Sequence, residues 1–221
     1  MKTGMIVCGF PGIGKTCVAS ELERYVDLES SGFNLTERDD EGRAEKMDHW
    51  EQAYCQIAFD MAFQGKIVFV SSHKNIRDRL FEMQKKTIFH ADIPILIVYP
   101  GPENKKNWLE RLERRYWISY NCGLPDVSKN KAAWKACEKH YDDFISELDG
   151  IDLNMEGMEN VYRIVVHNAV YNLKDELSSF ITTYDTMING NFAIAMAKDR
   201  IKHYKNTIVV ENSDNTEEGD K

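Results

Sequence analysis

The chain has no long hydrophobic run, and no stretch approaches the roughly 18 apolar residues that would predict a membrane-spanning helix. No signal-peptide pattern precedes the first apolar segment, which begins within the first few residues and is typical of a core strand. The five cysteines are odd in number and scattered, without a Cys-x-x-Cys pair, as in proteins with reduced thiols. These absences predict a cytoplasmic protein without a membrane partner.

Positive charge is also scarce. The 28 Lys and Arg residues face 36 Asp and Glu residues, which gives a net charge of −8. Many acidic residues gather at 37–41, an expected surface loop, and at 211–221, an expected disordered tail. Because an acidic chain has no general attraction for nucleic acid, such a partner would need a local basic patch and is not favoured.

Two nucleotide-related motifs are missing as well. A GTPase reads its base with an Asn-Lys-x-Asp segment, and the chain contains none. A motor ATPase usually places an acidic residue at the end of the strand that corresponds to the one predicted here at 66–71. In this chain Ser72 and His73 follow that strand instead. Motor and GTPase functions are therefore disfavoured, whereas a nucleotide-dependent interaction protein stays open.

One motif that is present is specific. The stretch Gly9-Phe10-Pro11-Gly12-Ile13-Gly14-Lys15-Thr16 fits the phosphate-binding loop pattern, between an apolar strand and a predicted helix. Backbone N–H groups of such a loop face one point, where Lys15 reaches the outer phosphates and Thr16 binds magnesium. We therefore predict ATP and Mg²⁺ as ligands. The residues expected to hold ATP here are Gly9, Gly12, Ile13, Gly14, Lys15, Thr16 and Cys17.

Apolar segments alternate with segments of helical periodicity along the chain. Strands are expected at 3–8, 25–28, 66–71, 94–99 and 161–166, with a further short one at 207–210. Helices are expected at 15–25, 44–64, 74–86, 103–116, 131–148, 173–182 and 191–205, with a polar loop at 29–43. This alternation predicts an α/β fold of three layers, α/β/α, around a five-stranded parallel sheet.

The same pattern suggests how the chain is organised. Residues 1–184 are expected to form the core, with 44–64 as an acceptor-side helix and about 100–157 as a lid with an insertion. A helical appendage is expected at 185–210, before the tail. Because parallel strands end at one edge of the sheet, ligands are expected at that edge.

Two acids follow the second predicted strand. Asp27 and Glu29 are two residues apart on extended chain, so they point to the same face. Asp27 could hold a magnesium-bound water, and Glu29 could accept a proton or hydrogen bond from an acceptor hydroxyl. Ser30 and Ser31 would adjoin the acceptor. The alternative is a polar strand exit, since such residues are common in turns.

The segments after the other strands add polar and cationic side chains. Ser72 and His73 could contact the acceptor, and Arg77 could bind it if it is anionic. The alternatives are that His73 only starts a helix and that Arg77 is an exposed helix arginine. Arg111 and Arg115 lie four residues apart and could stabilise charge during transfer, unless they form a solvated face with Glu110 and Glu113. Asn168, after the fifth strand, is a candidate contact for the adenine base.

In this order the motifs resemble the P-loop kinases of the nucleoside-monophosphate, shikimate and gluconate kinase group. The chain is most similar to uncharacterised, phage-associated P-loop kinase-like proteins through Asp27 to Ser31, Ser71 through Leu80, and Tyr99-Pro100 followed by the paired arginines. The likeness covers roughly residues 3 to 120. It implies that Asp27 lies beside the metal and Glu29 beside the acceptor. If the chain is phage-encoded, its compartment is the host cytoplasm.

The chain also departs from that group. Glu29 stands where shikimate kinases have aspartate, and Tyr116 follows the arginines where glycine is usual. The favoured hypothesis is therefore an enzyme, a P-loop kinase that transfers phosphate from ATP to a small acceptor. A nucleotide or nucleoside is the favoured acceptor. The alternatives are a kinase acting on a nucleic-acid end or modified base, and a non-catalytic ATP-binding protein.

Overall fold

A computed structural model describes residues 4–34, 47–168, 170–189, 201–202 and 204–205. The expected acidic loop at 37–41, the strand at 207–210 and the tail at 211–221 lie outside these residues. Of the helix expected at 191–205, only 201–202 and 204–205 are described, and they are helical. Within the described residues, no helix combines the length and the apolar character needed to cross a membrane.

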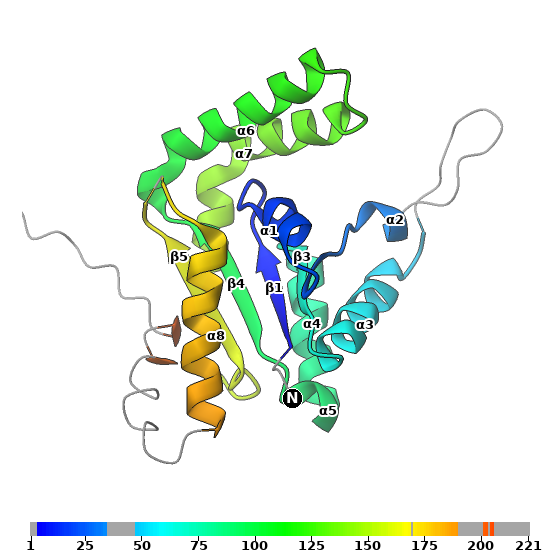
Figure 1. Ribbon diagram of the computed structural model, residues 1–221, viewed down its shortest axis with the longest axis vertical. Coiled ribbons are helices and arrows are strands. Elements are labelled where there is room, and N and C mark those ends of the chain that lie inside the picture. Colours follow the sequence, from blue (N-terminus) through cyan, green and yellow to red (C-terminus); the bar gives the residue numbers. More distant parts are fainter. Residues whose placement is uncertain (1–3, 35–46, 169, 190–200, 203, 206–221) are drawn as a thin grey trace, which may run out of the picture.

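The centre of the molecule is a five-stranded sheet in which all strand pairs are parallel (Figure 1). Its strands are β1 (Met5–Gly9), β2 (Tyr25–Asp27), β3 (Ile67–Ser71), β4 (Ile95–Pro100) and β5 (Val161–Val166), in the order β2-β3-β1-β4-β5. Every residue of β1 and β4 is buried, which explains their continuous apolar runs. The predicted α/β class and the parallel five-stranded sheet are confirmed.

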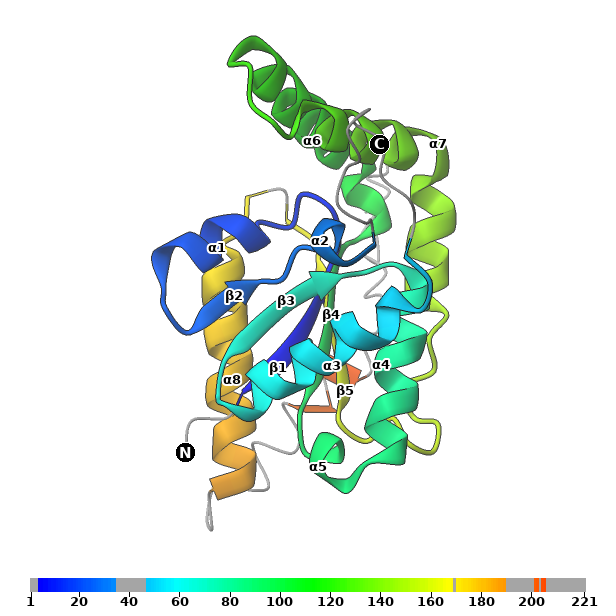
Figure 2. The same cartoon turned by 90° about the vertical axis from the view of Figure 1, so that its right-hand side faces the viewer.

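Helices cover both faces of the sheet, as Figures 1 and 2 show. Helices α1 (Lys15–Glu21) and α8 (Leu173–Asn189) lie on one face. Helices α3 (Trp50–Phe63) and α4 (Lys74–Lys86) lie on the other, with the short α5 (Ile88–Ala91) after them. The arrangement is consistent with three layers, and the glycine loop leaves the sheet at its central strand.

Several element boundaries differ from those predicted. The helix expected from residue 44 begins at Trp50, because His49 adopts a left-handed conformation with φ of 55°. The helix expected to reach residue 25 ends at Glu21, where Leu22 is extended. The segment predicted as loop at 29–43 contains a short helix, α2 (Ser31–Asn34). Helix α8 runs through residues 184 and 185, where a boundary between core and appendage was expected.

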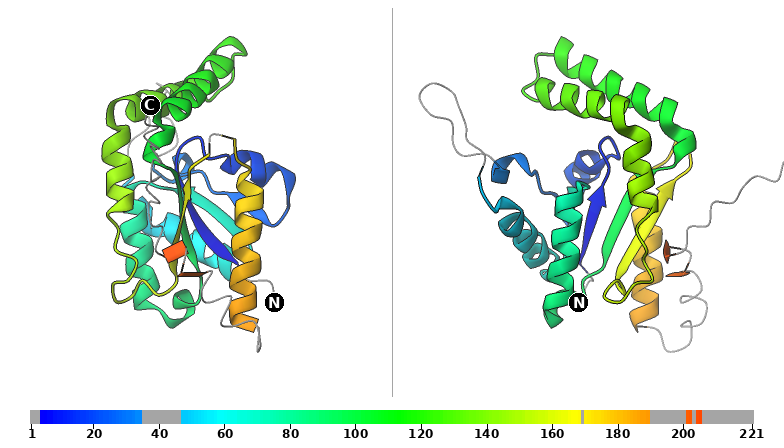
Figure 3. Two further views of the ribbon diagram at one scale, coloured as in Figure 1. Left: turned by 90° about the vertical axis from the view of Figure 1, so that its left-hand side faces the viewer. Right: turned by 180° about the vertical axis from the view of Figure 1, so that it is seen from behind.

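Two helices project past the carboxyl edge of the sheet (Figures 1 and 3). A single 3₁₀ turn, η1 (Pro102–Asn104), leads into helix α6 (Lys105–Asn121), which is followed by α7 (Val127–Asp149). Helix α6 was expected at 103–116 and ends later than that. Helix α7 was expected at 131–148 and begins earlier. Helix α7 bends at His140, whose backbone is not helical. Residues 105–139 form what we call the arm, and the rest of α7 packs beside the sheet.

Candidate functional site

A cavity of about 990 Å³ opens at the carboxyl edge of the sheet. The segments that follow β1, β2 and β3 form its floor, and α6 and α7 form its roof. The residues named from the sequence that line it are Gly9, Gly12, Ile13, Gly14, Lys15, Thr16, Cys17, Asp27, Glu29, Ser30, Ser72, His73, Arg77, Arg111 and Arg115. Fifteen residues chosen by motif and by position after a strand therefore lie around one space.

The glycine loop has a fixed shape. Gly12 and Gly14 both have positive φ, 79° and 96°, a conformation that L side chains rarely adopt. Trp108 donates a hydrogen bond from Nε1 to the Pro11 carbonyl at 2.9 Å, and the Tyr171 hydroxyl donates to the Ile13 carbonyl at 2.5 Å. These bonds occupy two loop carbonyls, which stabilises the loop backbone.

Replacing Gly12 by alanine is expected to lower the free energy of unfolding by about 2 kcal/mol, because a left-handed alanine costs about 1 to 2 kcal/mol. The added Cβ would also lie only 2.9 Å from Leu112 Cδ2. Urea unfolding measures the change. Gly32→Ala is the matched control, because its Cβ would meet nothing within 4 Å. Equal losses in both variants would contradict the strain at Gly12.

Lys15 begins α1 and reaches back over the loop, where its Nζ donates to the Gly9 carbonyl at 2.6 Å. Burial lowers the pKa of Lys15 to about 8, although the carboxylates of Asp27 and Glu29 act in the opposite direction. Burial removes water from the ammonium group and so disfavours its charged form. A bound anion would stabilise that charge in place of the lost water. Lys15 is therefore placed and tuned to receive negative charge.

Thr16 and Asp27 form an oxygen pair beside Lys15. The Thr16 hydroxyl donates to Asp27 Oδ2 at 2.5 Å, joining the start of α1 to the end of β2. Magnesium takes oxygen ligands, keeps several waters, and needs only one or two protein ligands when phosphates supply others. The described residues contain no group of three or more His, Cys, Asp or Glu side chains placed to hold a metal. The Thr16–Asp27 pair fits magnesium bound together with a nucleotide.

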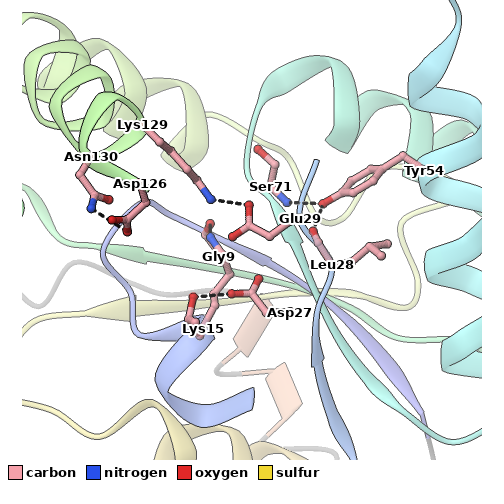
Figure 4. A network of polar contacts seen from close by, with 11 residues as sticks. Gly9, Lys15, Asp27, Leu28, Glu29, Tyr54, Ser71, Asp126, Lys129 and Asn130 are labelled. Atoms are coloured by element: carbon pink, nitrogen blue, oxygen red, sulfur yellow. Dashed lines mark hydrogen bonds and ion pairs between the residues drawn. The ribbon is translucent and has the colours of Figure 1, made fainter. Parts of the chain in front are cut away.

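Glu29 points toward the roof of the cavity (Figure 4), where Lys129 of α7 forms an ion pair with it. The exit of β2 is held by Tyr54, whose hydroxyl donates to the Leu28 carbonyl at 2.7 Å and accepts from the Ser71 N–H at 3.1 Å. This bridge fixes the backbone beside Glu29 against the end of β3. Glu29 and Asp27 thus occupy separate positions, with Asp27 near Thr16 and Glu29 facing α7.

Arg77 is buried, with 4% of its surface exposed, so the alternative of an exposed helix arginine is wrong. It donates to the Ser72 carbonyl and forms an ion pair with Glu147, which ties α4 to α7. Its buried Nε has no hydrogen-bond partner among the described residues. His73 lies beside it, where desolvation of the ring and then the positive charges of Lys15 and Arg77 lower the pKa of His73. Ser72 lines the cavity here.

Arg111 and Arg115 both line the cavity from α6. The Arg111 guanidinium carbon lies 4.6 Å from the centre of the Trp108 ring and 5.2 Å from that of Tyr171, and these rings stack on each other. Such cation–π contacts fix the direction of a guanidinium group while leaving its charge in place. The alternative weighed for both arginines, a solvated Glu/Arg helix face, does not describe Arg111, whereas Arg115 is exposed and is not distinguished from such a face.

One of the predicted residues is not brought to this cavity, and of another the structure describes only the backbone. Asn168 is absent from its lining, and its side-chain oxygen accepts a hydrogen bond from the Val170 N–H at 3.0 Å. The backbone of Ser31 begins α2, and its side chain lies outside the described set. The structure therefore gives no support to Asn168 as a contact for the base.

Sequence reasoning missed the contribution of α7. Asp126, Lys129, Asn130 and Glu147 line the cavity, and Asn130 donates to Asp126 at 2.8 Å (Figure 4). Spacings of three and four residues put Asp126, Lys129 and Asn130 on one face at the start of α7, whereas Glu147 lies beyond the bend at His140. The helix was predicted only from residue 131, so three of these residues lay outside it and were not placed on a helix face.

Fold and site together define an α/β protein with a parallel sheet, a glycine loop after its central strand and a cavity above that loop whose lining includes charged side chains. No family model, curated protein or solved structure matches the chain.

Proposed function

We propose that the chain is a P-loop kinase of the nucleoside-monophosphate, shikimate and gluconate kinase group, which transfers phosphate from ATP to a nucleotide or nucleoside acceptor. One observation carries the proposal: the glycine loop brings Lys15 and the Thr16–Asp27 oxygen pair together in the cavity. The loop follows the central strand of a parallel sheet, at the edge where such sheets bind ligands.

The donor end of the cavity suits the phosphates of ATP. The loop N–H groups and the start of α1 favour negative charge, and Lys15 supplies a cation. Thr16 and Asp27 would hold Mg²⁺, which when bound neutralises charge on the outer phosphates. Arg111 and Arg115 would add positive charge from the roof. These groups attract phosphate by charge and hydrogen bonding and form no covalent bond to it. Positioning and charge stabilisation are what a protein mainly contributes to phosphoryl transfer.

The acceptor end combines cations with carboxylates. Glu29, Arg77, Lys129 and Glu147 line it, together with Ser30, Ser72 and His73. In the transfer, an acceptor oxygen forms a bond to the γ-phosphorus while the bond from that phosphorus to the bridging oxygen of ADP breaks. The acceptor hydroxyl proton passes to Glu29. A ligand with both hydroxyl and anionic groups, such as a nucleotide, fits this mixture of charges.

Titration calorimetry with ATP and GTP, each with Mg²⁺, tests the donor assignment. We expect ATP to bind in preference, and a clear preference for GTP would contradict the assignment. A panel of nucleotides, nucleosides, sugars and small acids then tests transfer by the release of ADP. Binding of ATP without acceptor-dependent ADP release across the panel would favour the alternative of a non-catalytic ATP-binding protein.

ATP binding is expected to weaken as the pH rises above about 8, because the pKa of Lys15 is lowered to about 8. Below that pH the ammonium group is charged and attracts phosphate. Above it, the group is neutral and must take up a proton when ATP binds, so affinity falls by up to about tenfold per pH unit. Calorimetry in buffers of different ionisation enthalpy measures both affinity and proton uptake. An affinity that stays constant through this range would contradict the role of Lys15.

A further inference from the structure

The arm differs in composition from the rest of the chain. Residues 105–139 contain nine Lys and Arg against four Asp and Glu, a net charge of +5 in a chain whose total is −8. They also contain three of the four tryptophans. Positive charge that is scarce elsewhere is thus gathered on two helical segments that project past the carboxyl edge of the sheet (Figure 3). This is the local basic patch that an acidic chain needs to bind nucleic acid.

Aromatic rings are exposed among these cations. Tyr116, Trp117, Tyr120 and Trp134 form a ring cluster, in which the Trp117 centroid lies 4.9 Å from Tyr116 and 5.7 Å from Tyr120. Trp117 is 45% exposed and Tyr120 57% exposed, and Lys135 Nζ lies 4.0 Å from the centre of the Trp134 ring. Bases of single strands stack on exposed rings while nearby cations hold the phosphates.

The cavity continues beneath the arm. A second cavity of about 300 Å³ shares Arg111, Arg115, Asp126 and Asn130 with the main one and adds Arg114, Ile118 and Leu124, among others. Helical spacing puts Arg114, Arg115 and Ile118 on the cavity side of α6, and Trp117 and Tyr120 on its other side. A ligand that fills the main cavity can therefore extend outward along an arm that carries cations on this side and exposed rings on the other.

We propose that the arm binds single-stranded nucleic acid and that the phosphoryl acceptor is a nucleotide of that strand, with its neighbours held along the arm. Strand binding stands by itself, whereas the transfer step rests on the proposed function. A hydroxyl oxygen of the strand bonds to the γ-phosphorus of ATP, the bond to ADP breaks, and the hydroxyl proton passes to Glu29. The arm carries cations on one side of α6 and exposed rings on the other, and this combination favours a nucleic acid over an acidic protein partner.

Fluorescence anisotropy with labelled single-stranded DNA and RNA of about a dozen nucleotides tests the proposal, without ATP or Mg²⁺. Trp117→Ala is expected to weaken binding by about fivefold or more, through loss of base stacking. Arg114→Ala is expected to reduce the slope of log affinity against log salt by about 0.7, the value for one phosphate contact on a single strand. Binding of either nucleic acid supports the proposal.

Two variants outside the arm are matched controls. Phe63 on α3 is 69% exposed, and Arg79 on α4 pairs with Glu82, so Phe63→Ala and Arg79→Ala should leave strand binding unchanged. Absence of binding at about 50 mM salt would overturn the proposal, as would equal effects of arm and control variants. So would a dimer that Trp117→Ala converts to a monomer, since the rings would then contact a second copy. ATP titration of the same protein does not depend on strand binding. A failure of the kinase proposal would therefore appear as absence of ATP binding in that titration, whatever the strand-binding result.

Discussion

Replacing Lys15 by methionine is expected to reduce phosphoryl transfer by about 100- to 1000-fold, the usual loss when one preorganised group facing developing charge is removed. The side chain lies in the cavity and reaches the glycine loop, so no other cation in the cavity occupies its position. Methionine keeps the length of the stem but has no charge. Steady-state ADP release, with the wild-type acceptor at saturation, measures the loss.

The same variant should fold at least as well as the wild type. Burial lowers the pKa of Lys15, which means that the charged form is disfavoured in the folded chain. Removing that charge therefore costs little stability, and thermal unfolding can separate loss of function from loss of fold. Lys174→Met, at a half-buried position paired with Glu21 of α1, is the control. Transfer that persists in Lys15→Met would remove the central support of the kinase proposal.

The parts of the fold with strong local signals were predicted closely. Helix α4 has the expected bounds of 74–86, and β5 the expected 161–166. A clear apolar period, and an apolar run bounded by polar residues, decide such elements with little help from the rest of the chain. His49 shows the limit: no local pattern indicates that its backbone turns left-handed and delays the helix to Trp50.

The floor of the cavity was predictable, because each of its residues follows a strand and parallel strands end at one edge of the sheet. The roof of the cavity could not be predicted in this way. Glu29 and Lys129 are separated by 100 residues, and Arg77 and Glu147 by 70. These pairs depend on where α7 bends at His140 and on which face it then turns to the sheet. Spacing along one helix cannot give that direction, so the partner of each strand-end residue came only from the structure.

Replacing Asp27 by asparagine is expected to raise the Mg²⁺ concentration needed for half-maximal transfer by about 10- to 100-fold, the range seen when a partner of a metal ligand is lost. Asparagine keeps the size of the side chain and can still accept the Thr16 hydrogen bond, but it lacks the negative charge that favours a divalent cation. Titration of Mg²⁺ at fixed ATP measures the shift.

Glu29→Gln separates the metal from the acceptor within the same cavity. Glu29 faces Lys129 of α7, whereas Asp27 contacts Thr16, so the two carboxylates should act at opposite ends of the transferred group. Loss of the Glu29 carboxylate should lower the transfer rate at every Mg²⁺ concentration without shifting the midpoint of the titration, because the proton acceptor is lost and the Thr16–Asp27 pair is kept. If both variants shifted the midpoint equally, the carboxylates would share the metal, and the division of the cavity into a donor end and an acceptor end would be wrong.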